Sequence, residues 1–311
     1  MIRITPKVAD ALLNGRPVVA LESSVLAQGL PIPANREAAE RMTLAVARGG
    51  AVAAITGVID GTPTLGLTHD ELERFLARDG IRKVSSRDLA VAVAQRQSGA
   101  TTVAATLALI ARSDIRVFAT GGIGGVHREP AFDESADLVE LARTPRVVVC
   151  AGAKSILDLP ATLERLETLG VPVIGYRCRE FPAFFSTSSG LPVTAVAESP
   201  EEIAAIERAH RRLGRDEALL IVQPPPIDAA IPRDEIEAAV EGALREAAAQ
   251  HVRGAAVTPF LLAAVERATA GRSRRTNLAL LEANALLAGQ IAAALVRDDI
   301  PPVPSGRIHA S

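Results

Sequence analysis

Aromatic residues and net charge are both scarce in this sequence. It contains no tryptophan, one tyrosine and seven phenylalanines among 311 residues, and its formal net charge at pH 7 is −2. Proteins that bind nucleic acid polymers rely on basic surfaces against the phosphates and on aromatic side chains against the bases. We therefore expect no nucleic acid polymer as a partner.

Cysteines and long hydrophobic runs are also few. Cys150 and Cys178 are the only cysteines and form no CxxC pair, which favours a reducing compartment. No apolar run reaches the roughly 18 residues of a membrane-spanning helix. The first residues lack the apolar core of a signal peptide. These features predict a cytoplasmic protein with no membrane partner.

Several catalytic signatures are missing as well. The sequence has five histidines but no HExxH pattern and no Cys/His cluster, which argues against a zinc site. It also lacks GxGxxG, the P-loop lysine pattern and GxSxG. These are signatures of dinucleotide-binding proteins, P-loop NTPases and many serine hydrolases. Any active site must be built from other groups.

Lysine is the most informative shortage. Only Lys7, Lys83 and Lys154 are lysines among the 34 residues that are Lys or Arg. An arginine keeps its proton at accessible pH, whereas a buried lysine can lose its proton and form a Schiff base with a carbonyl carbon. Lys83 and Lys154 adjoin loops of small residues, which favours a site. The alternative is that both are ordinary surface residues.

Apolar runs alternate with amphipathic segments, mostly at the spacing of βα units, apart from one hairpin. We predict an α/β fold with three layers, α/β/α, with a central mixed sheet and a helical C-terminal cap. One domain is expected over residues 1–298, and a disordered tail over residues 299–311. Strands are predicted at residues 17–21, 81–84, 117–120, 147–151, 171–175 and 218–223, a hairpin at 52–67, and helices at 35–48, 68–78, 99–112, 156–168, 233–250, 258–269 and 274–296.

The stretch from Val117 to Asp158 holds the strongest indications of a ligand site. Its first predicted strand is followed by a loop with four glycines, and its second by Gly152 and Lys154. Ligands bind at the carboxyl ends of strands in open α/β sheets, and glycines let backbone amides approach an anion. Glu22 also directly follows a predicted strand, where it is either an acid–base group or a structural residue that caps a helix or forms a salt bridge.

Other polar residues complete a candidate site for a phosphorylated sugar. Lys83, Thr101 and Thr102 are candidate phosphate ligands, with plain helix capping as the alternative for the two threonines. Asp133 and Asp137 could supply oxygen ligands to a hard cation, although acids ahead of a helix are commonly solvated. Together with the acid and the lysine described above, this set suits chemistry at the anomeric carbon of the sugar.

Long motifs make the sequence similar to a known family. They include ALESSVLAQGLPIPAN at Ala20–Asn35, KVSSRDL at Lys83–Leu89, GATTVAAT at Gly99–Thr106, FATGGIGGVHR at Phe118–Arg128, DESADL at Asp133–Leu138 and CAGAKSILD at Cys150–Asp158. By these motifs the chain resembles the pseudouridine-5′-phosphate glycosidases, a family that also includes the indigoidine synthase A-type proteins. The likeness covers about residues 5–298.

The resemblance implies a reversible reaction in which pseudouridine 5′-phosphate and water give uracil and ribose 5-phosphate. The bond broken is C–C, and a carbon leaving group has no lone pair to protonate. An electron sink therefore replaces the usual carboxylate pair of a glycosidase. The resemblance assigns this sink to a Schiff base between Lys154 and C1′ of the ring-opened ribose, and it makes Glu22 the proton donor or acceptor.

The remaining site residues are also implied by the resemblance. Asp133 would hold a manganese ion, Mn2+, as cofactor, and the chain would form a homotrimer. The segment before Asp133 is shorter than is usual in the family and lacks its customary glycine, and Glu134 stands where an apolar residue is common. Substrate contacts are implied at Lys83, Val103, His127, Ser135, Ala136, Asp137 and Asn277, with His127 near the phosphate and Asn277 at the uracil edge.

Two other functions stay open at this point. The first is an enzyme that acts on a related C-glycoside or sugar phosphate, including an accessory role in pigment synthesis. The second is a non-catalytic protein that binds a sugar phosphate. The presence of Glu22, Lys83, Asp133 and Lys154 favours an enzyme over a binding protein.

Overall fold

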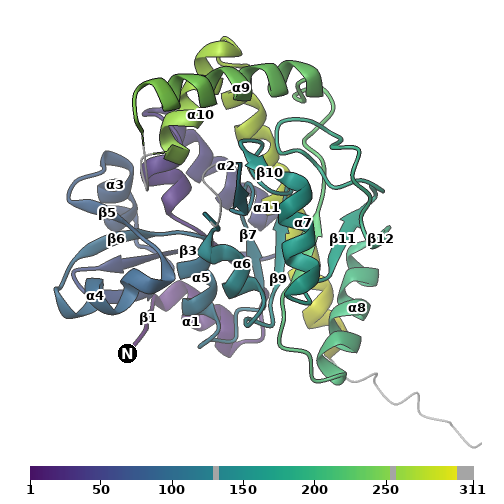
Figure 1. The fold of residues 1–311 in the computed structure, drawn as a ribbon. Coiled ribbons are helices and arrows are strands. Elements are labelled where there is room, and N and C mark those ends of the chain that lie inside the picture. Colours follow the sequence, from purple (N-terminus) through teal and green to yellow (C-terminus); the bar gives the residue numbers. More distant parts are fainter. Residues whose placement is uncertain (129–132, 253–256, 300–311) are drawn as a thin grey trace, which may run out of the picture.

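The computed structural model describes residues 1–128, 133–252 and 257–299. It has three layers, with a mixed sheet between two layers of helices (Figure 1), which confirms the predicted fold class. One face of the sheet is covered by α5 (Val103–Ile110), α6 (Ala136–Leu141) and α7 (Leu159–Thr168), and the other by α2 (Ala34–Arg48), α8 (Pro200–Arg212) and α11 (Arg272–Asp299).

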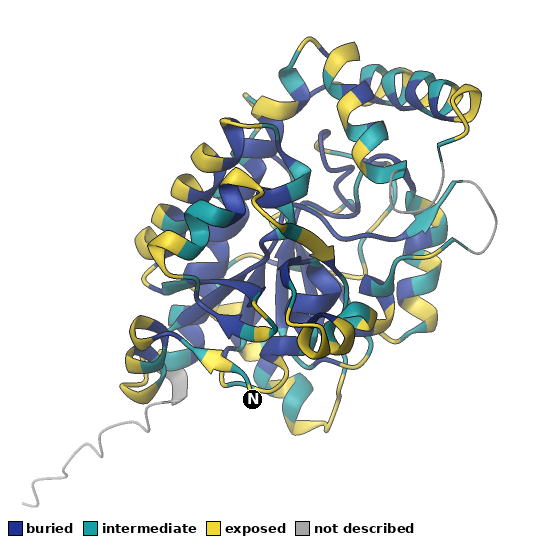
Figure 2. Ribbon diagram, turned by 90° about the vertical axis from the view of Figure 1, so that its left-hand side faces the viewer, coloured by how far each residue is buried: buried dark blue, intermediate teal, exposed yellow. Residues whose placement is uncertain are grey.

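The centre of the sheet is parallel. Every residue of three of its strands is buried, in agreement with their unbroken apolar sequences VVAL, VVVC and LLIV (Figure 2). A parallel sheet covered by helices on both faces requires such strands. In spatial order the parallel strands are β2 (Val18–Leu21), β7 (Val117–Ala119), β9 (Val147–Cys150), β13 (Leu219–Val222), β11 (Val173–Tyr176) and β12 (Ala195–Ala197).

The strand β3 (Val52–Ile59) makes the sheet mixed. Its first half pairs in parallel with β2, and its second half pairs antiparallel with β4 (Thr62–Leu65) and β6 (Ser98–Thr101). β1 (Arg3–Ile4) and β5 (Ile81–Val84) extend this region by parallel pairing with β4 and β6. The predicted hairpin of β3 and β4 is therefore confirmed.

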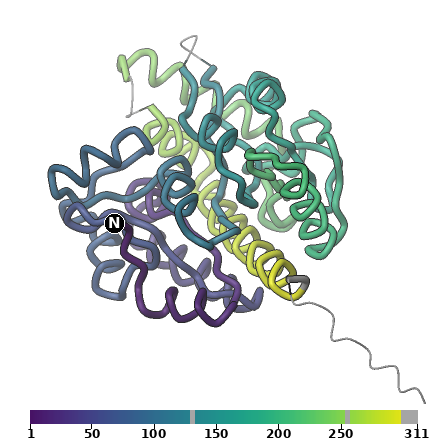
Figure 3. Tube along the Cα trace, turned by 90° about the horizontal axis from the view of Figure 1, so that it is seen from below, coloured from purple at the N-terminus to yellow at the C-terminus, as the bar shows by residue number. Residues whose placement is uncertain are grey.

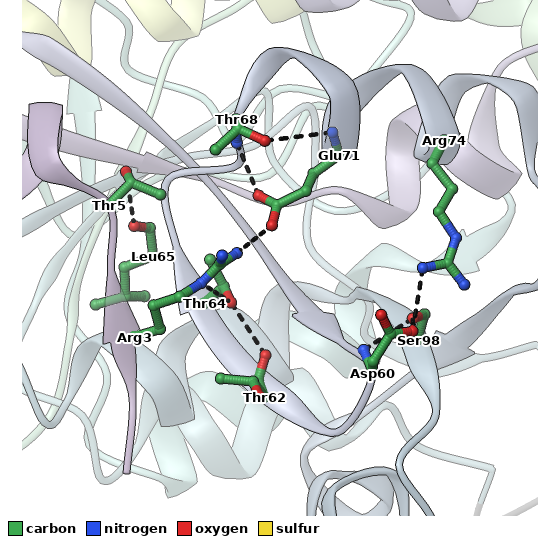
Figure 4. Close-up of polar contacts among 10 residues, drawn as sticks. All are labelled: Arg3, Thr5, Asp60, Thr62, Thr64, Leu65, Thr68, Glu71, Arg74 and Ser98. Carbon is green, nitrogen blue, oxygen red and sulfur yellow. Dashed lines mark hydrogen bonds and ion pairs between the residues drawn. The ribbon is translucent and has the colours of Figure 1, made fainter.

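Side-chain contacts fasten this edge of the sheet to the helix α3 (His69–Ala77; Figure 4). Thr68 and Glu71 form the capping box that begins α3. Arg3 of β1 makes an ion pair with the same Glu71, and Ser98 of β6 donates a 2.7 Å hydrogen bond to Asp60. The outermost strand is thus held by a helix as well as by its neighbouring strand.

The helical cap consists of α9 (Arg233–Ala249) and α10 (Val257–Ala268), which lie across the carboxyl ends of the parallel strands (Figure 1). The third C-terminal helix, α11, packs along the sheet against α2, α8 and β7 (Figure 3). It is long and apolar enough to cross a membrane by length and composition, yet 61% of its most apolar window is buried inside the protein, as in a core helix. The predicted tail lies, apart from Asp299, outside the described residues.

Two predicted helix starts are wrong. Residues 99–101 belong to β6, and α5 begins only after Thr102, which caps it. Leu157–Asp158 forms β10, which pairs antiparallel with β8 (Val126–His127), and Asp158 caps α7. In both cases the capping side chain marks the point where the strand ends and the helix begins.

The remaining elements are α1 (Pro6–Leu13), a π-helical turn at Val25–Gly29, α3 (His69–Ala77), a 3-10 turn at Ser86–Asp88 and α4 (Leu89–Ala94).

The crossing of α2 and α11 depends on two glycines. A Cβ added at Gly289 would lie 2.7 Å from the Val46 carbonyl oxygen and 2.9 Å from the Gly49 Cα. We expect Gly289→Ala to lower the free energy of unfolding by roughly 1–3 kcal/mol, because overpacking outweighs the better helix propensity of alanine. Chemical denaturation would measure this change.

The matched control is Gly242→Ala in α9. A Cβ there meets nothing closer than the Arg245 guanidinium at 4.0 Å. This variant should gain up to about 1 kcal/mol from helix propensity alone. Equal stability of the two variants would contradict the close approach of α2 and α11.

Candidate active site

Three neighbouring strands bring the candidate catalytic groups together. Glu22 follows β2 directly, Thr120 follows β7 directly, and Lys154 lies in the loop after β9. Because β2, β7 and β9 are adjacent and parallel, their carboxyl ends meet at one edge of the sheet. The loops predicted to form a site therefore do converge.

These loops enclose a cavity with two lobes. The residues shared by both lobes are Glu22, Ser24, Lys83, Lys154 and Thr258. The polar lobe is completed mainly by Arg82, Ser85, Arg87, Thr102, Val103, Gly124, His127, Ser135 and Asp137. The apolar lobe is completed by Val25, Gln28, Gly29, Thr120, Gly121, Gly122, Phe184, Pro259, Leu262 and Asn277. Of the predicted site residues, Thr101, Asp133 and Ala136 line neither lobe.

Glu22 is a buried carboxyl group with 5% of its surface exposed. The hydroxyls of Ser24 and Thr120 donate hydrogen bonds to its two oxygens. Burial raises the pKa of Glu22, and the positive charge of Lys154 and the two hydrogen bonds only partly oppose this effect. A carboxyl group that holds its proton more firmly than usual is suited to general acid catalysis.

The Lys154 loop is held in place by tight backbone packing. The backbone amide of Lys154 donates a hydrogen bond to the Ile123 carbonyl oxygen at 3.1 Å. Gly152 has φ +81°, and a Cβ there would lie 2.2 Å from the Pro182 carbonyl oxygen, so the position requires glycine. The nearby Cys150 is buried, and burial raises the pKa of its thiol to about 12. Cys150 is therefore a poor nucleophile and lines neither lobe, whereas Lys154 lines both.

The glycine-rich loop after β7 serves packing more than anion binding. A Cβ at Gly122 would lie 2.6 Å from the Phe184 ring, and one at Gly124 would lie 2.3 Å from the Ser135 hydroxyl. The Gly124 amide donates to a carboxylate of the protein itself, Asp137, at 2.8 Å. The loop can approach its neighbours so closely because it lacks side chains.

Asp137 lines the polar lobe but is engaged by the backbone. It is buried, and its second oxygen accepts from the Ala104 amide at 2.9 Å, at the start of α5. The carboxylate therefore ties the glycine-rich loop to the first turn of α5. Ser135 caps α6, and its amide donates to the Gly125 carbonyl oxygen at 2.9 Å. Both residues fix the wall of the cavity.

Lys83 and Thr102 belong to the polar lobe. Lys83 is exposed to solvent and also lines the apolar lobe. The pKa of Lys83 is lowered, first by partial burial and second by the positive charge of Lys154. The carboxylates of Glu22 and Asp137 oppose this change. The prediction for Thr101 is wrong, because its hydroxyl is fully buried beneath the site and bonds to Thr56 at 2.7 Å.

Asp133 lies beside the polar lobe. Its side chain is 44% exposed and stands 3.9 Å from His127 Nδ1, while the neighbouring Glu134 pairs with Arg165 at 2.9 Å. No group of three or more His, Cys, Asp or Glu side chains gathers as metal ligands within the described residues. The shortened segment noted before Asp133 falls largely on residues 129–132, outside the described part. A cation held here would need oxygen ligands from water or substrate, which Mn2+ accepts.

The helix α11 contributes two asparagines, one of which sequence reasoning missed. Asn277 lines the apolar lobe. Asn284 lies two turns later on the same face, donates to the Thr120 carbonyl oxygen at 2.8 Å and accepts from Gln223 at 2.9 Å. The sequence did contain a signal for Asn284, because two asparagines seven residues apart in a helix of Leu and Ala fall on the same face, and both are buried.

The raised pKa of Glu22 predicts a stability change. Between the usual value of 4.5 and the raised value, the folded protein binds more protons than the unfolded chain, so stability falls as pH rises through this range. Glu22→Gln removes the ionisable group and should make the protein more stable than wild type at pH 7. The difference should shrink as pH falls below about 4.5. Urea unfolding at both pH values would test this, and a variant less stable than wild type at pH 7 would contradict it.

The described geometry agrees with solved structures of similar sequence. Prealnumycin C-glycosynthase AlnA, solved in complex with ribulose 5-phosphate, superposes with a TM-score of 0.89 at 38% identity, covering 96% of this chain and 98% of its own. An indigoidine synthase A-like protein from Thermotoga maritima superposes with a TM-score of 0.87 at 39% identity, covering 96% and 97%.

Sequence relatives agree as well. The pseudouridine-5′-phosphate glycosidase of Gemmatimonas aurantiaca is 64% identical over 294 residues, which are 94% of this chain and 96% of the relative. That of Herpetosiphon aurantiacus is 51% identical and covers 94% and 97%. The family described as indigoidine synthase A like protein matches residues 7–294. The predicted family is thus confirmed, and the chain belongs to the indigoidine synthase A-like family, together with enzymes named pseudouridine-5′-phosphate glycosidases.

Proposed function

We propose that this enzyme cleaves the C–C glycosidic bond of pseudouridine 5′-phosphate to give uracil and ribose 5-phosphate, reversibly. The observation that carries the proposal is the position of Glu22 and Lys154. Both line the junction between a polar and an apolar lobe, where a nucleotide with a charged end and a flat base would place its sugar. The names of the close relatives support the substrate.

The polar lobe suits the phosphate and the ribose. Lys83 supplies a positive charge, and His127 and Thr102 supply hydrogen-bonding side chains. Val103, the first residue of α5, lines the same lobe. Ser135 and Asp137 fix the opposite wall, and Ala136 acts only through the helix start that they form. The apolar lobe, with Phe184, Leu262 and Asn277, receives the uracil.

The reaction then needs one amine and one acid. Glu22 protonates the ring oxygen O4′ as the C1′–O4′ bond breaks, and the Lys154 amine bonds to C1′. The lysine nitrogen then passes its extra proton to the Glu22 carboxylate, the C1′–C5 bond breaks, C5 of uracil takes this proton from Glu22, and a protonated C1′=N imine with Lys154 remains. Water hydrolyses this imine to the C1′ aldehyde of ribose 5-phosphate and restores the lysine. The sum consumes one water, as the reaction requires.

The role of Lys154 can be tested by charge-conserving substitution. Lys154→Arg keeps the positive charge but cannot form the imine, so we expect uracil release from pseudouridine 5′-phosphate to fall by a factor on the order of 10^4 or more. Lys7→Arg, an exposed lysine in α1, is the matched control and should release uracil at the wild-type rate.

Borohydride reduction adds a second measurement. With ribose 5-phosphate present, the wild type should gain the mass of a reduced sugar adduct on the peptide that contains Lys154, and Lys154→Arg should gain none. Uracil release by Lys154→Arg at a rate near wild type would disprove the imine. No release by any variant or by the wild type would disprove the proposed substrate.

We also propose that Mn2+ is the cofactor and is held at Asp133. The carboxylate is accessible, His127 lies beside it, and both adjoin the polar lobe. Oxygen ligands from water and a substrate phosphate would complete the coordination of such a hard cation. When bound, the metal would supply positive charge next to the phosphate. The homotrimer and the cytoplasmic location also stay predictions. The two free cysteines are consistent with a reducing compartment.

The metal proposal predicts the behaviour of Asp133→Asn. Loss of the charged ligand should weaken manganese binding by roughly 10-fold or more. Electron paramagnetic resonance of free Mn2+ during a titration measures this without any turnover. Glu134→Gln is the control, because its carboxylate is paired with Arg165, and should bind as wild type does. An unchanged titration of Asp133→Asn would remove Asp133 as a ligand.

A further inference from the structure

Two buried oxygens in the apolar lobe have no hydrogen-bond partner. They are Oε1 of Gln28 and Oδ1 of Asn277, both amide carbonyls. Within the described residues, five buried side-chain polar atoms lack a partner. Buried acceptors are nearly always paired in folded proteins. Two of the same kind in one lobe of a cavity therefore point to a ligand that carries two donors.

The side chain of Gln28 is oriented by the protein. Gln28 lies in the π-helical turn that follows Glu22, and its Nε2 donates to the Ile81 carbonyl oxygen of β5 at 3.3 Å. The reverse amide orientation would set two oxygens against each other. The carbonyl of Gln28 is consequently the end that is left for a ligand.

Both amides lie at the end of the lobe remote from the catalytic lysine. Gln28 and Asn277 also line an adjoining cavity on the side of Arg78 and Glu266, whose lining includes neither Glu22 nor Lys154. A base whose sugar carbon is bonded to Lys154 would therefore turn its far edge toward these two residues. The intervening walls, which include Val25 and Phe184, are apolar.

We infer that Gln28, together with Asn277, selects a uracil that is joined to its sugar through carbon; this rests on the proposed function. A uracil joined through C5 carries N1–H and N3–H on its far edge, on either side of the C2 carbonyl, and these two donors match the two acceptors. A uracil joined through N1, as in uridine 5′-phosphate, has N3–H as its single ring donor. One buried acceptor would then stay unpaired, and a buried unpaired acceptor strongly weakens binding of such a ligand.

Gln28→Met tests the inference, because methionine has a similar length and lacks the carbonyl. Assayed in the direction of synthesis, the variant should raise KM for uracil roughly tenfold and leave KM for ribose 5-phosphate unchanged. Gln95→Met, an exposed glutamine at the end of α4, is the matched control and should change neither. An equal rise in both KM values would show that Gln28 only supports β5, the strand of Lys83, and would overturn the inference.

Gln28→Ala gives a second, independent readout. It should lose activity on pseudouridine 5′-phosphate but accept a methyl group on one ring nitrogen, so that the ratio of kcat/KM for the N1-methyl or the N3-methyl substrate over the parent rises at least tenfold. Unchanged ratios for both methylated substrates would overturn the role of Gln28 while the proposed reaction stands. Failure of the wild type to release uracil would overturn the proposed reaction and the inference with it.

Discussion

Burial of the Glu22 carboxyl beside Lys154 is the constraint on which the site depends. An isolated carboxylate at this depth would be costly, and the hydroxyls of Ser24 and Thr120 and the lysine charge offset only part of that cost. These partners come from loops after β2, β7 and β9, so the arrangement exists only while those strands stay in register. A firmly held proton next to an amine is what acid-assisted imine chemistry requires.

Glycines and the Asp137 carboxylate position the loops that carry these groups. At Gly122, Gly124 and Gly152, an added Cβ would come within 2.2–2.6 Å of a neighbouring atom. Asp137 then joins the glycine-rich loop to α5 through two backbone amides. Residues that look like ligand contacts in the sequence, such as Asp137 and the glycines, thus hold parts of the protein together, whereas Lys83 lines the polar lobe.

The C-terminal helix α11 belongs to both the packed core and the wall of the cavity. α11 packs on the sheet and crosses α2 closely at Gly49 and Gly289. This position places Asn284 at the end of β7, where it bonds to the Thr120 carbonyl oxygen. Asn277, on the same face, reaches the apolar lobe. The same helix therefore packs in the core and lines the apolar lobe of the cavity.

The sequence by itself determined the fold class, most strands of the sheet apart from β6 and β12, and the loops that hold the site, because unbroken apolar runs, capping residues and glycines act locally. Its shortage of lysine singled out Lys154 and Lys83. Only the tertiary structure decided that Thr101 belongs to a buried hydroxyl network and not to the ligand site. It also decided that Asn284 supports the loop and that Gln28 and Asn277 share one lobe with unpaired oxygens. Such pairings join residues far apart in the chain, and no local pattern encodes which distant atoms will meet.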